Sequence, residues 1–368
     1  MADAKDMLNL AARTALRAFG DVEPNPMVGA VIVRDGTVIG VGHHRRFGGL
    51  HAEREALADC RRRGHDPRGA TVFVTLEPCC HHGKQPPCTD ALIEAGVERV
   101  VFARPDPDEA SGGGADMLRR AGVECEACAD STLAVRVGDP FVKRNTTGMP
   151  WVVAKWAQTA GGRVASRTGE PRWISCQAAR RRVHRLRARV DAIVTGVGTV
   201  LADDPALTAR GVRVHRVARR VVLDARLETP PVCTLVRTAR RAPTTIVTAG
   251  APRASARSAL ESAGVDVVAV GGSGRVDLGA AMRLLVERYG ATTVLLEAGP
   301  RLLVSMLEAG LVDAAMVHTA PRTDARDSRL THEESRLHAI IGDAQRFSLV
   351  RTRRAGVDVE RWYCSVRP

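Results

Sequence analysis

In the first third of the chain, the spacing of apolar positions alternates between a helical and an extended period. Apolar residues recur with helical spacing from residue 6 to residue 19 and stop at Gly20, which predicts a helix at the start. Two apolar runs then flank Asp35-Gly36, so we expect a hairpin of strands 28–33 and 38–41. The pattern goes on to predict helices over 52–62, 90–95 and 115–121 and strands over 71–76, 100–103 and near Val123. This alternation indicates an α/β domain whose largely parallel sheet is covered on both faces.

A pause in this pattern between residues 138 and 150 marks the expected domain boundary. We place a first domain at 1–147 and a second at 148–368, where a new apolar strand begins at Trp151. The second domain repeats the α/β theme, and we see no similarity between the two halves. Its predicted helices span 177–190, 278–289 and 301–309. Its predicted strands span 151–155, 192–195, 221–224, 244–248, 265–270, 293–297, 314–318, 346–352 and 357–366.

Composition narrows the class of protein. With 368 residues, of which 45% are hydrophobic, the chain has enough apolar side chains for a core in each domain. No run of 18 uncharged apolar residues occurs, and the first residues include Asp3 and Asp6. We therefore expect a cytoplasmic protein without a secretion signal or a membrane segment. Nine cysteines in such a chain favour reduced thiols or metal ligands over disulfide bonds.

The chain is strongly basic, with 54 Lys and Arg against 41 Asp and Glu and a net charge of +13. This charge would suit a nucleic acid, a membrane surface or a small phosphorylated ligand. Aromatic residues make up only 3% of the chain, so the stacking side chains of a single-strand binder are scarce. We expect a small phosphorylated molecule as the partner, and neither a nucleic acid nor a membrane.

Three segments of the first domain carry the residue types of a zinc deaminase: His51-Ala52-Glu53, Pro78-Cys79 and Cys88. One imidazole and two thiolates fill three corners of a tetrahedral zinc site, which leaves the fourth for water with a pKa lowered to about 7. Glu53 lies at a helix start, two residues after His51, where it can accept the proton of that water and return protons to the substrate. Three residues between the two cysteines are alternative ligands: Cys80, His81 and His82.

Further motifs make the chain resemble one family. They are Pro24-Asn25-Pro26-x-Val28-Gly29, Thr75-Leu76-Glu77-Pro78-Cys79, His81-His82-Gly83, Pro86-Pro87-Cys88 and Val200-Leu201-Ala202-Asp203-Asp204-Pro205-x-Leu207-Thr208. Taken in order, they are similar to the bifunctional pyrimidine deaminase/reductase of riboflavin biosynthesis. The resemblance implies a three-layer domain with the cytidine-deaminase fold, which removes an amino group from 2,5-diamino-6-(ribosylamino)-4(3H)-pyrimidinone 5′-phosphate. It also implies an α/β second domain resembling dihydrofolate reductase, which uses NADPH to reduce the ribose of the product to a ribityl chain.

The resemblance assigns substrate contacts in the first domain. Asn25 and His44 would contact the base, Lys84 the phosphate, and Asp106 the ribose or the phosphate. Asp108 stands where the family usually has asparagine, and its carboxylate would repel a phosphate. The position of the phosphate in the first site therefore stays open.

In the second domain, the resemblance makes Arg187 and Arg210 phosphate contacts and places Leu207 and Glu297 beside the substrate. Gly299 follows a strand and opens a helix, whose free N–H groups would suit the NADPH pyrophosphate. Further cofactor contacts implied by the resemblance are Lys155, Ala157, Trp173, Thr199 and Asp203.

The second domain also departs from the family pattern. Gly161 replaces an aspartate, Pro171 replaces a serine that usually meets the substrate, and residues 322–326 replace a glycine-rich stretch. The alternative function is therefore a deaminase whose second domain is inactive or reduces another pyrimidine, and a nucleic-acid deaminase is the least favoured one. We also expect a homo-oligomer.

Overall fold

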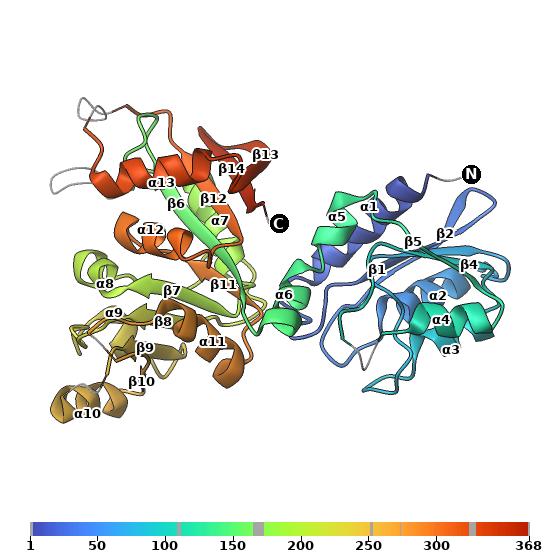
Figure 1. The fold of residues 1–368 in the computed structure, drawn as a ribbon, viewed down its shortest axis with the longest axis horizontal. Coiled ribbons are helices and arrows are strands. Elements are labelled where there is room, and N and C mark those ends of the chain that lie inside the picture. The colour runs from blue at the N-terminus through green and yellow to red at the C-terminus, as the bar shows by residue number, and fades with distance from the viewer. Residues whose placement is uncertain are drawn as a thin grey trace. The chain divides into compact units, whose positions relative to one another are not determined.

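The computed structural model describes residues 3–108, 112–164, 173–250, 253–272, 274–323 and 329–366. The chain forms two compact units, Met1–Met149 and Pro150–Pro368, each with a sheet of its own (Figure 1). The first unit thus ends at Met149, close to the boundary that the sequence predicts after residue 147. Within the described residues, no helix combines the length and the apolar character that crossing a membrane requires. Pro171 and residues 324–326, two of the departures from the family pattern, lie outside the described residues.

The sheet of the first unit has five strands in the order β2-β1-β3-β4-β5. They are β1 (Gly29–Arg34), β2 (Thr37–His43), β3 (Thr71–Val74), β4 (Arg99–Phe102) and β5 (Glu124–Ala127). Asp35 and Gly36, with φ of 51° and 74°, close the predicted hairpin of β1 and β2. β1 is antiparallel to both its neighbours, whereas β3, β4 and β5 are parallel. The prediction of a largely parallel sheet is therefore wrong for the part around β1, because a tight turn reverses the chain at once.

Helices cover both faces of this sheet, as predicted. Ile32 and Val31 are neighbours on β1 and point to opposite faces, so each belongs to a different core cluster. The cluster around Val31 contains residues of α1 (Ala4–Ala15) and α5 (Thr132–Arg136). The cluster around Ile32 contains residues of α2 (Ala52–Arg62), α3 (Cys88–Glu94) and α4 (Gly114–Arg120). The 3-10 turn η1 (Leu16–Ala18) follows α1, and α6 (Asp139–Thr147) comes just before the boundary.

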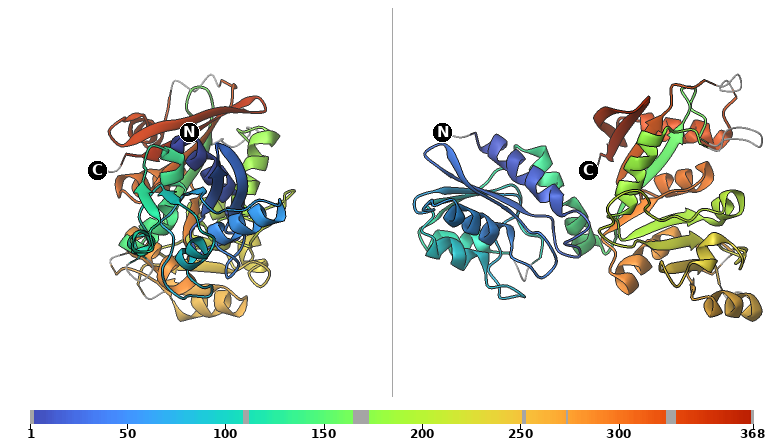
Figure 2. Two further views of the ribbon diagram at one scale, coloured as in Figure 1. Left: turned by 90° about the vertical axis from the view of Figure 1, so that its right-hand side faces the viewer. Right: turned by 180° about the vertical axis from the view of Figure 1, so that it is seen from behind.

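The sheet of the second unit has nine strands in the order β10-β9-β8-β7-β11-β6-β12-β14-β13. Figure 2 shows the ribbon of this unit from two further sides. They are β6 (Trp151–Gln158), β7 (Ala192–Gly196), β8 (Arg219–Leu223), β9 (Thr244–Thr248), β10 (Asp266–Ala269), β11 (Thr293–Leu296), β12 (Ala314–Thr319), β13 (Phe347–Ala355) and β14 (Asp358–Ser365). The seven strands from β10 to β12 are parallel, and the final hairpin of β13 and β14 adds two antiparallel strands. Each predicted strand of this half has a counterpart.

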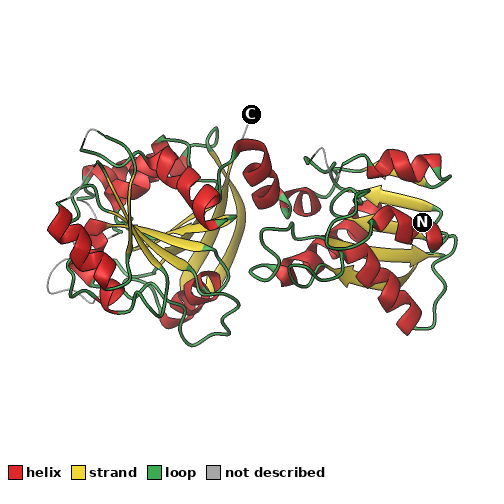
Figure 3. Cartoon of the chain, turned by 90° about the horizontal axis from the view of Figure 1, so that it is seen from below, coloured by secondary structure: helices red, strands yellow, loops and turns green. Residues whose placement is uncertain are grey.

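The central strands of this sheet are buried on both faces. Every residue of β9 and β11 is buried, which is the pattern of a parallel sheet covered by helices on two sides. Figure 3 shows these helices on either side of the strands. They are α7 (Gln177–Arg187), α8 (Val197–Asp203), α9 (Thr234–Arg237), α10 (Ala254–Ser262), α11 (Leu278–Tyr289), α12 (Pro300–Glu308) and α13 (His332–Gly342).

Candidate functional site

The three predicted metal ligands of the first unit meet at one point. Nδ1 of His51 lies 3.5 Å from Sγ of Cys79 and 3.4 Å from Sγ of Cys88, and the ligand atoms of all three residues lie within 4.8 Å of one another. With Zn–S bonds of about 2.3 Å and Zn–N bonds of about 2.0 Å, neighbouring corners of a zinc tetrahedron lie about 3.6 Å apart. The donor set and its spacing therefore fit a zinc ion.

Helix ends and a short backbone link hold these ligands. His51 is the N-cap of α2, and Cys88 is the first residue of α3. The backbone carbonyl of Cys79 accepts hydrogen bonds from the N–H groups of Cys88 and Thr89, so the eight-residue insert returns to its own start. Arg54, which the sequence analysis did not single out, donates from its guanidinium to the Pro87 carbonyl at 2.8 Å. This contact ties α2 to the start of α3.

The alternative ligands in the insert lie elsewhere. Sγ of Cys80 donates to the carbonyl of Gly112 at 3.0 Å, and His81 and His82 are exposed. In the described part of the chain, His51, Cys79 and Cys88 are the one group of three or more His, Cys, Asp or Glu side chains with metal-ligand spacing.

Glu53 is buried beside this cluster, in the first turn of α2. Burial, together with the negative charge of the Cys79 thiolate, raises the pKa of Glu53 to about 7. A hydrogen bond with Cys88, followed by one with His51, lowers the pKa of the Cys79 thiol to about 4. The site thus combines a thiolate that is ready to bind a metal with a carboxyl group that can exchange protons at neutral pH.

Asn25 and His44 lie together next to the cluster. Nδ1 of His44 is 2.9 Å from the Leu50 carbonyl, so that nitrogen carries the proton and Nε2 can accept from the Asn25 amide at 3.2 Å. The ring of His44 packs edge-on against that of His51, with their centroids 5.4 Å apart. Burial lowers the pKa of His44, which favours this neutral form.

The two remaining candidates of the first unit lie on loops. The ammonium group of Lys84 lies 3.6 Å from the centre of the Phe47 ring, at an exposed position of the insert. The backbone N–H of Asp106 donates to the carboxylate of Glu77, which also accepts from the N–H of Ala115. Glu77 is buried and ties the loop of Asp106 to α4. Glu77 belongs to the motif Thr75-Leu76-Glu77-Pro78-Cys79, but the spacing of that motif did not indicate that its carboxylate binds two backbone N–H groups.

A second candidate site lies at the carboxyl ends of the central strands of the second unit. There β11 enters between β7 and β6, and ligands of open α/β sheets bind where the strand order reverses in this way. Glu297 directly follows β11, and Gly299 is the N-cap of α12. The other candidates in this region are Lys155 and Ala157 on β6 and Thr199 and Asp203 on α8, directly after β7.

A largely buried ion pair forms the centre of this second site. Nε and one terminal nitrogen of Arg187 donate to the two carboxylate oxygens of Glu297 at 2.6 Å and 2.9 Å, a bidentate pair. Lys155 lies partly buried near it, and desolvation lowers the pKa of its ammonium group while the charge of Glu297 opposes this. Burial would raise the pKa of Glu297, but Arg187 and then Lys155 hold it below its usual value.

A loop closes over this ion pair. Leu207, with φ of 46°, is buried, and the carbonyl of Thr208 accepts from Arg187 at 3.2 Å. The guanidinium of Arg210 is 3.4 Å from the Thr208 hydroxyl. His184, which the sequence analysis missed, accepts at Nδ1 from the backbone N–H of Arg210 at 3.3 Å. The feature of the sequence that could have indicated His184 is its position three residues before Arg187, which puts both residues on the same face of α7.

Other predicted contacts of the second site lie apart from this ion pair or at its edge. Trp173 is 54% exposed, with the guanidinium of Arg180 5.2 Å from the centre of its ring. Asp203 and Gly299 are exposed, and Thr199 is partly buried. Gly161, where the family usually has aspartate, lies in a tight loop closed by two hydrogen bonds between Thr159 and Arg163.

Each half of the chain matches a known protein family. Residues 1–104 match the model described as the cytidine and deoxycytidylate deaminase zinc-binding region, and residues 150–355 match the RibD C-terminal domain. The riboflavin biosynthesis protein RibD of Actinobacillus pleuropneumoniae is 39% identical over 319 residues, 86% of this chain and 83% of the relative. RibD of Escherichia coli is 36% identical over 374 residues, 95% of this chain and 96% of the relative.

This chain belongs to the RibD family.

Solved RibD structures extend the match to three dimensions. Acinetobacter baumannii RibD is 31% identical with a TM-score of 0.78, and the match covers 99% of each chain. A Thermotoga maritima protein titled as a diaminohydroxyphosphoribosylaminopyrimidine deaminase/5-amino-6-(5-phosphoribosylamino)uracil reductase is 30% identical with a TM-score of 0.78, again over 99% of each chain. The predicted family and the two-domain α/β fold, with a deaminase-like first domain and a reductase-like second domain, are confirmed.

Proposed function

We propose that this RibD protein carries out two consecutive reactions of riboflavin biosynthesis. The first domain removes an amino group from 2,5-diamino-6-(ribosylamino)-4(3H)-pyrimidinone 5′-phosphate by hydrolysis, and the second uses NADPH to reduce the ribosyl group of the product to a ribityl chain. The observation that carries the proposal is the meeting of His51, Cys79 and Cys88 beside the buried Glu53. The activities named for the Thermotoga relative are the same two.

The first domain would hold zinc through Nδ1 of His51 and the sulfurs of Cys79 and Cys88. Bound there, zinc supplies a water molecule whose pKa is lowered to about 7. Glu53 is the proton carrier: with a pKa of about 7 it can accept a proton and deliver it to the ring nitrogen and to the departing amine. Its burial keeps bulk water away from these transfers.

Asn25 and His44 orient the pyrimidine in this proposal. One N–H of the Asn25 amide is directed to Nε2 of His44, which leaves the second N–H and the amide oxygen for the edge of the base. The bond from His44 to the Leu50 carbonyl fixes the imidazole in the tautomer that this contact needs. Lys84, on the insert, and Asp106, on the loop held by Glu77, would contact the phosphate and the ribose.

In the second domain, Arg187, Arg210, Leu207 and Glu297 would hold the phosphorylated substrate. Glu297 keeps the Arg187 guanidinium in place, and the loop at Thr208 joins it to Arg210. NADPH supplies the hydride when it is bound. The residues that would contact it come from the carboxyl ends of β6, β7 and β11 and from Trp173, and they are Lys155, Ala157, Trp173, Thr199, Asp203 and Gly299.

The decisive experiment measures both reactions on the purified full chain. Zinc content, ammonia release from the diaminopyrimidine phosphate and oxidation of NADPH are followed in one sample. We expect about one zinc per chain, ammonia release without NADPH, and NADPH oxidation only after deamination. Ammonia release without any NADPH oxidation would leave a deaminase with an inactive second domain, the alternative that Gly161 supports. Neither reaction on this substrate would reject the proposal.

We propose that the enzyme works in the cytoplasm. A reducing cytoplasm fits the cysteines, because no disulfide bond forms among the described residues, which include all nine of them.

We also propose a homo-oligomer, and light scattering of the purified protein at micromolar concentration tests that state directly.

A further inference from the structure

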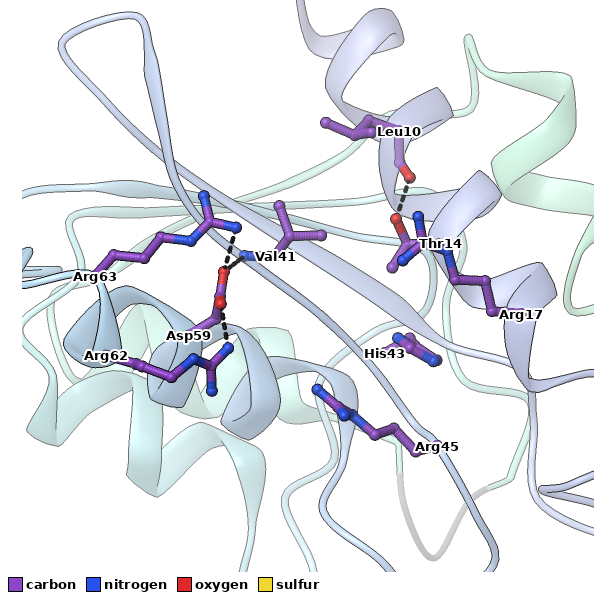
Figure 4. Close-up of a pocket in the computed structure, with 9 residues that line it drawn as sticks. All are labelled: Leu10, Thr14, Arg17, Val41, His43, Arg45, Asp59, Arg62 and Arg63. Atoms are coloured by element: carbon purple, nitrogen blue, oxygen red, sulfur yellow. Dashed lines mark hydrogen bonds and ion pairs between the residues drawn. The ribbon is translucent and has the colours of Figure 1, made fainter.

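The first domain contains a hollow of about 360 Å³ between α1, β2 and α2 (Figure 4). Four arginines contribute to its lining: Arg17, Arg45, Arg62 and Arg63. His43 and Asp59 complete its polar lining together with the hydroxyl of Thr14. None of these residues belongs to the set that would bind zinc or the substrate, so the hollow is a separate feature of the domain.

The carboxylates near the hollow do not balance its arginines. Asp59 accepts from both Arg62 and Arg63, and also from the backbone N–H of Val41 at 3.0 Å. Figure 4 shows Arg62 and Arg63 on either side of this one carboxylate. Two guanidinium groups thus share a single negative charge.

The other two arginines add further positive charge. Arg45 forms an ion pair with Glu55 at 3.1 Å, and 59% of the Arg45 side chain is exposed. Arg17, on η1, has no carboxylate partner within the described residues. Even when Glu55 is counted, four arginines face two carboxylates around the hollow.

His43 reports the electrostatic potential inside the hollow. Burial lowers its pKa, and the charges of Arg45, Arg17 and His44 lower it further, while Glu55 alone acts in the opposite direction. The charges of Arg45 and Arg17 thus add to burial in disfavouring the protonated imidazole, in agreement with the excess of arginines over carboxylates around the hollow. A bound anion would reverse this effect on His43.

We infer that this hollow is a binding site for the phosphate group of a small phosphorylated molecule. Guanidinium groups match phosphate in a planar, bidentate geometry, and several of them around one hollow suit a doubly charged phosphomonoester. The volume lies at the lower end of the roughly 300–1,000 Å³ of small-molecule sites. The lining offers no Phe, Tyr or Trp on which the bases of a nucleic acid could stack.

The location of the site gives it a connection to the deaminase centre. His43 is the last residue of β2, and the next residue, His44, contacts Asn25 and packs against His51. Arg62 and Arg63 belong to the same helix, or to its C-cap, whose first turn carries Glu53. The inference does not depend on the proposed reactions, because it rests on the charges of the hollow alone.

Histidine NMR of the full chain tests the inference at the site itself. The probes are inorganic phosphate and adenosine 5′-monophosphate, with adenosine as the uncharged control, and a His43→Gln variant assigns the His43 signals. We expect both phosphates to shift the His43 signals in a saturable way and to raise the His43 pKa, and adenosine to do neither. The Arg17→Met variant separates this binding from phosphate bound at the neighbouring deaminase centre, because Arg17 lines the hollow and is not among the residues proposed to bind the substrate.

Two matched variants decide which residues are responsible. Arg17→Met removes an arginine without leaving a carboxylate unpaired, and we expect roughly tenfold weaker binding of both phosphates. Arg61→Met removes an exposed arginine of α2 that does not line the hollow, and binding should not change. Unmoved His43 signals, or equal affinities of the two variants, would overturn the inference. A single-stranded oligonucleotide that shifts His43 at concentrations where the mononucleotide does not would overturn the choice of a small molecule.

Discussion

At the scale of single residues, a carboxyl group that moves protons at neutral pH needs a pKa near 7. Glu53 meets this requirement through burial and through the neighbouring Cys79 thiolate. Glu55, two positions further along the same helical turn, is paired with Arg45. Two glutamates in one turn therefore have different environments, and only one has the surroundings of a proton carrier.

We predict that Glu53→Gln lowers kcat of deamination by about a thousandfold, because the amide cannot carry protons. Zinc content should stay at the wild-type value, since the three ligands are unchanged. Atomic emission and an ammonia assay measure the two quantities. Glu55→Gln is the matched control and should keep both, whereas near-normal deamination by Glu53→Gln would assign the proton transfers to another group.

The ligand assignment has an equally direct test in two neighbouring cysteines. Cys79→Ser should lose most of its zinc and lower the Tm of the first domain, because assembly of the site and folding are coupled. Cys80→Ser should keep its zinc, since its sulfur is bonded to the Gly112 carbonyl and not to the cluster. Zinc analysis and calorimetry distinguish the variants. Loss of zinc from Cys80→Ser alone would make Cys80 the ligand.

The role of a residue could be predicted from the sequence where the residue belongs to a recognisable motif. It could not be predicted where the role depends on a partner that only the folded chain brings close. His51 and the two cysteines have few chemical uses at their spacing, so their meeting could be predicted. The pairing of Arg187 with Glu297, 110 positions apart, could not be predicted from spacing, because it depends on the fold bringing the end of α7 next to the residue that follows β11. His184 was missed for the same reason: its partner is a backbone N–H on a separate loop.

At the scale of elements, the strength of the apolar pattern decided what could be predicted. The limits of α2 and α11 agree with the prediction, and both helices bury a continuous stripe of residues. α6 was not predicted, and none of its residues is buried, so its sequence has no apolar face to find. α5, α8 and α9 are one or two turns long, too short for a period to be visible. α10 and α13 are longer and were also missed, although α13 begins with a capping box of Thr331 and Glu334.

One buried carboxylate links four elements of the second unit. Glu360 of β14 accepts from Arg353 and Trp362 at one oxygen and contacts Arg182 of α7 and His318 of β12 at the other. Its side chain is fully buried. Burial alone would raise its pKa, but the hydrogen bonds from His318, Arg353 and the other donors outweigh burial and hold the pKa far below the usual range.

This network predicts how acid affects the second unit. Because the pKa of Glu360 is lower in the folded state, its contribution is complete above the unfolded value of about 4.3 and is lost as the pH falls below it. Glu360→Gln should lower the free energy of unfolding at pH 7 by about 3 kcal/mol, since it leaves the partly buried Arg182 and Arg353 without their charge partner. Between pH 5 and pH 3.5, the variant should lose less further stability than the wild type. Urea unfolding followed by tryptophan fluorescence measures this, because all four tryptophans lie in the second unit. Parallel losses in both proteins would assign the acid response to other groups.

At the scale of the whole molecule, each unit contains a complete sheet, its own covering helices and one candidate catalytic site. No strand of one sheet pairs with the other sheet within the described residues. The zinc cluster draws all its ligands from the first unit, and the Arg187–Glu297 pair belongs to the second. Each set of candidate catalytic residues named above thus comes from one unit alone.

From this separation we predict that a point variant in one site impairs one reaction and leaves the other intact. Glu53→Gln should stop ammonia release but still oxidise NADPH when it is given the deaminated compound, 5-amino-6-(5-phosphoribosylamino)uracil. Arg187→Met should deaminate normally and lower kcat/KM of the reduction by roughly 10- to 100-fold, because a charge-assisted bidentate contact is lost. Arg185→Met is the control for this variant, since Arg185 is exposed on the same helix and should affect neither reaction. Separate assays for ammonia and NADPH, each started with its own substrate, measure both rates for each of the three variants. If Glu53→Gln also abolished reduction of the supplied intermediate, the second site would depend on turnover in the first, and the two units would have to act as one catalytic assembly.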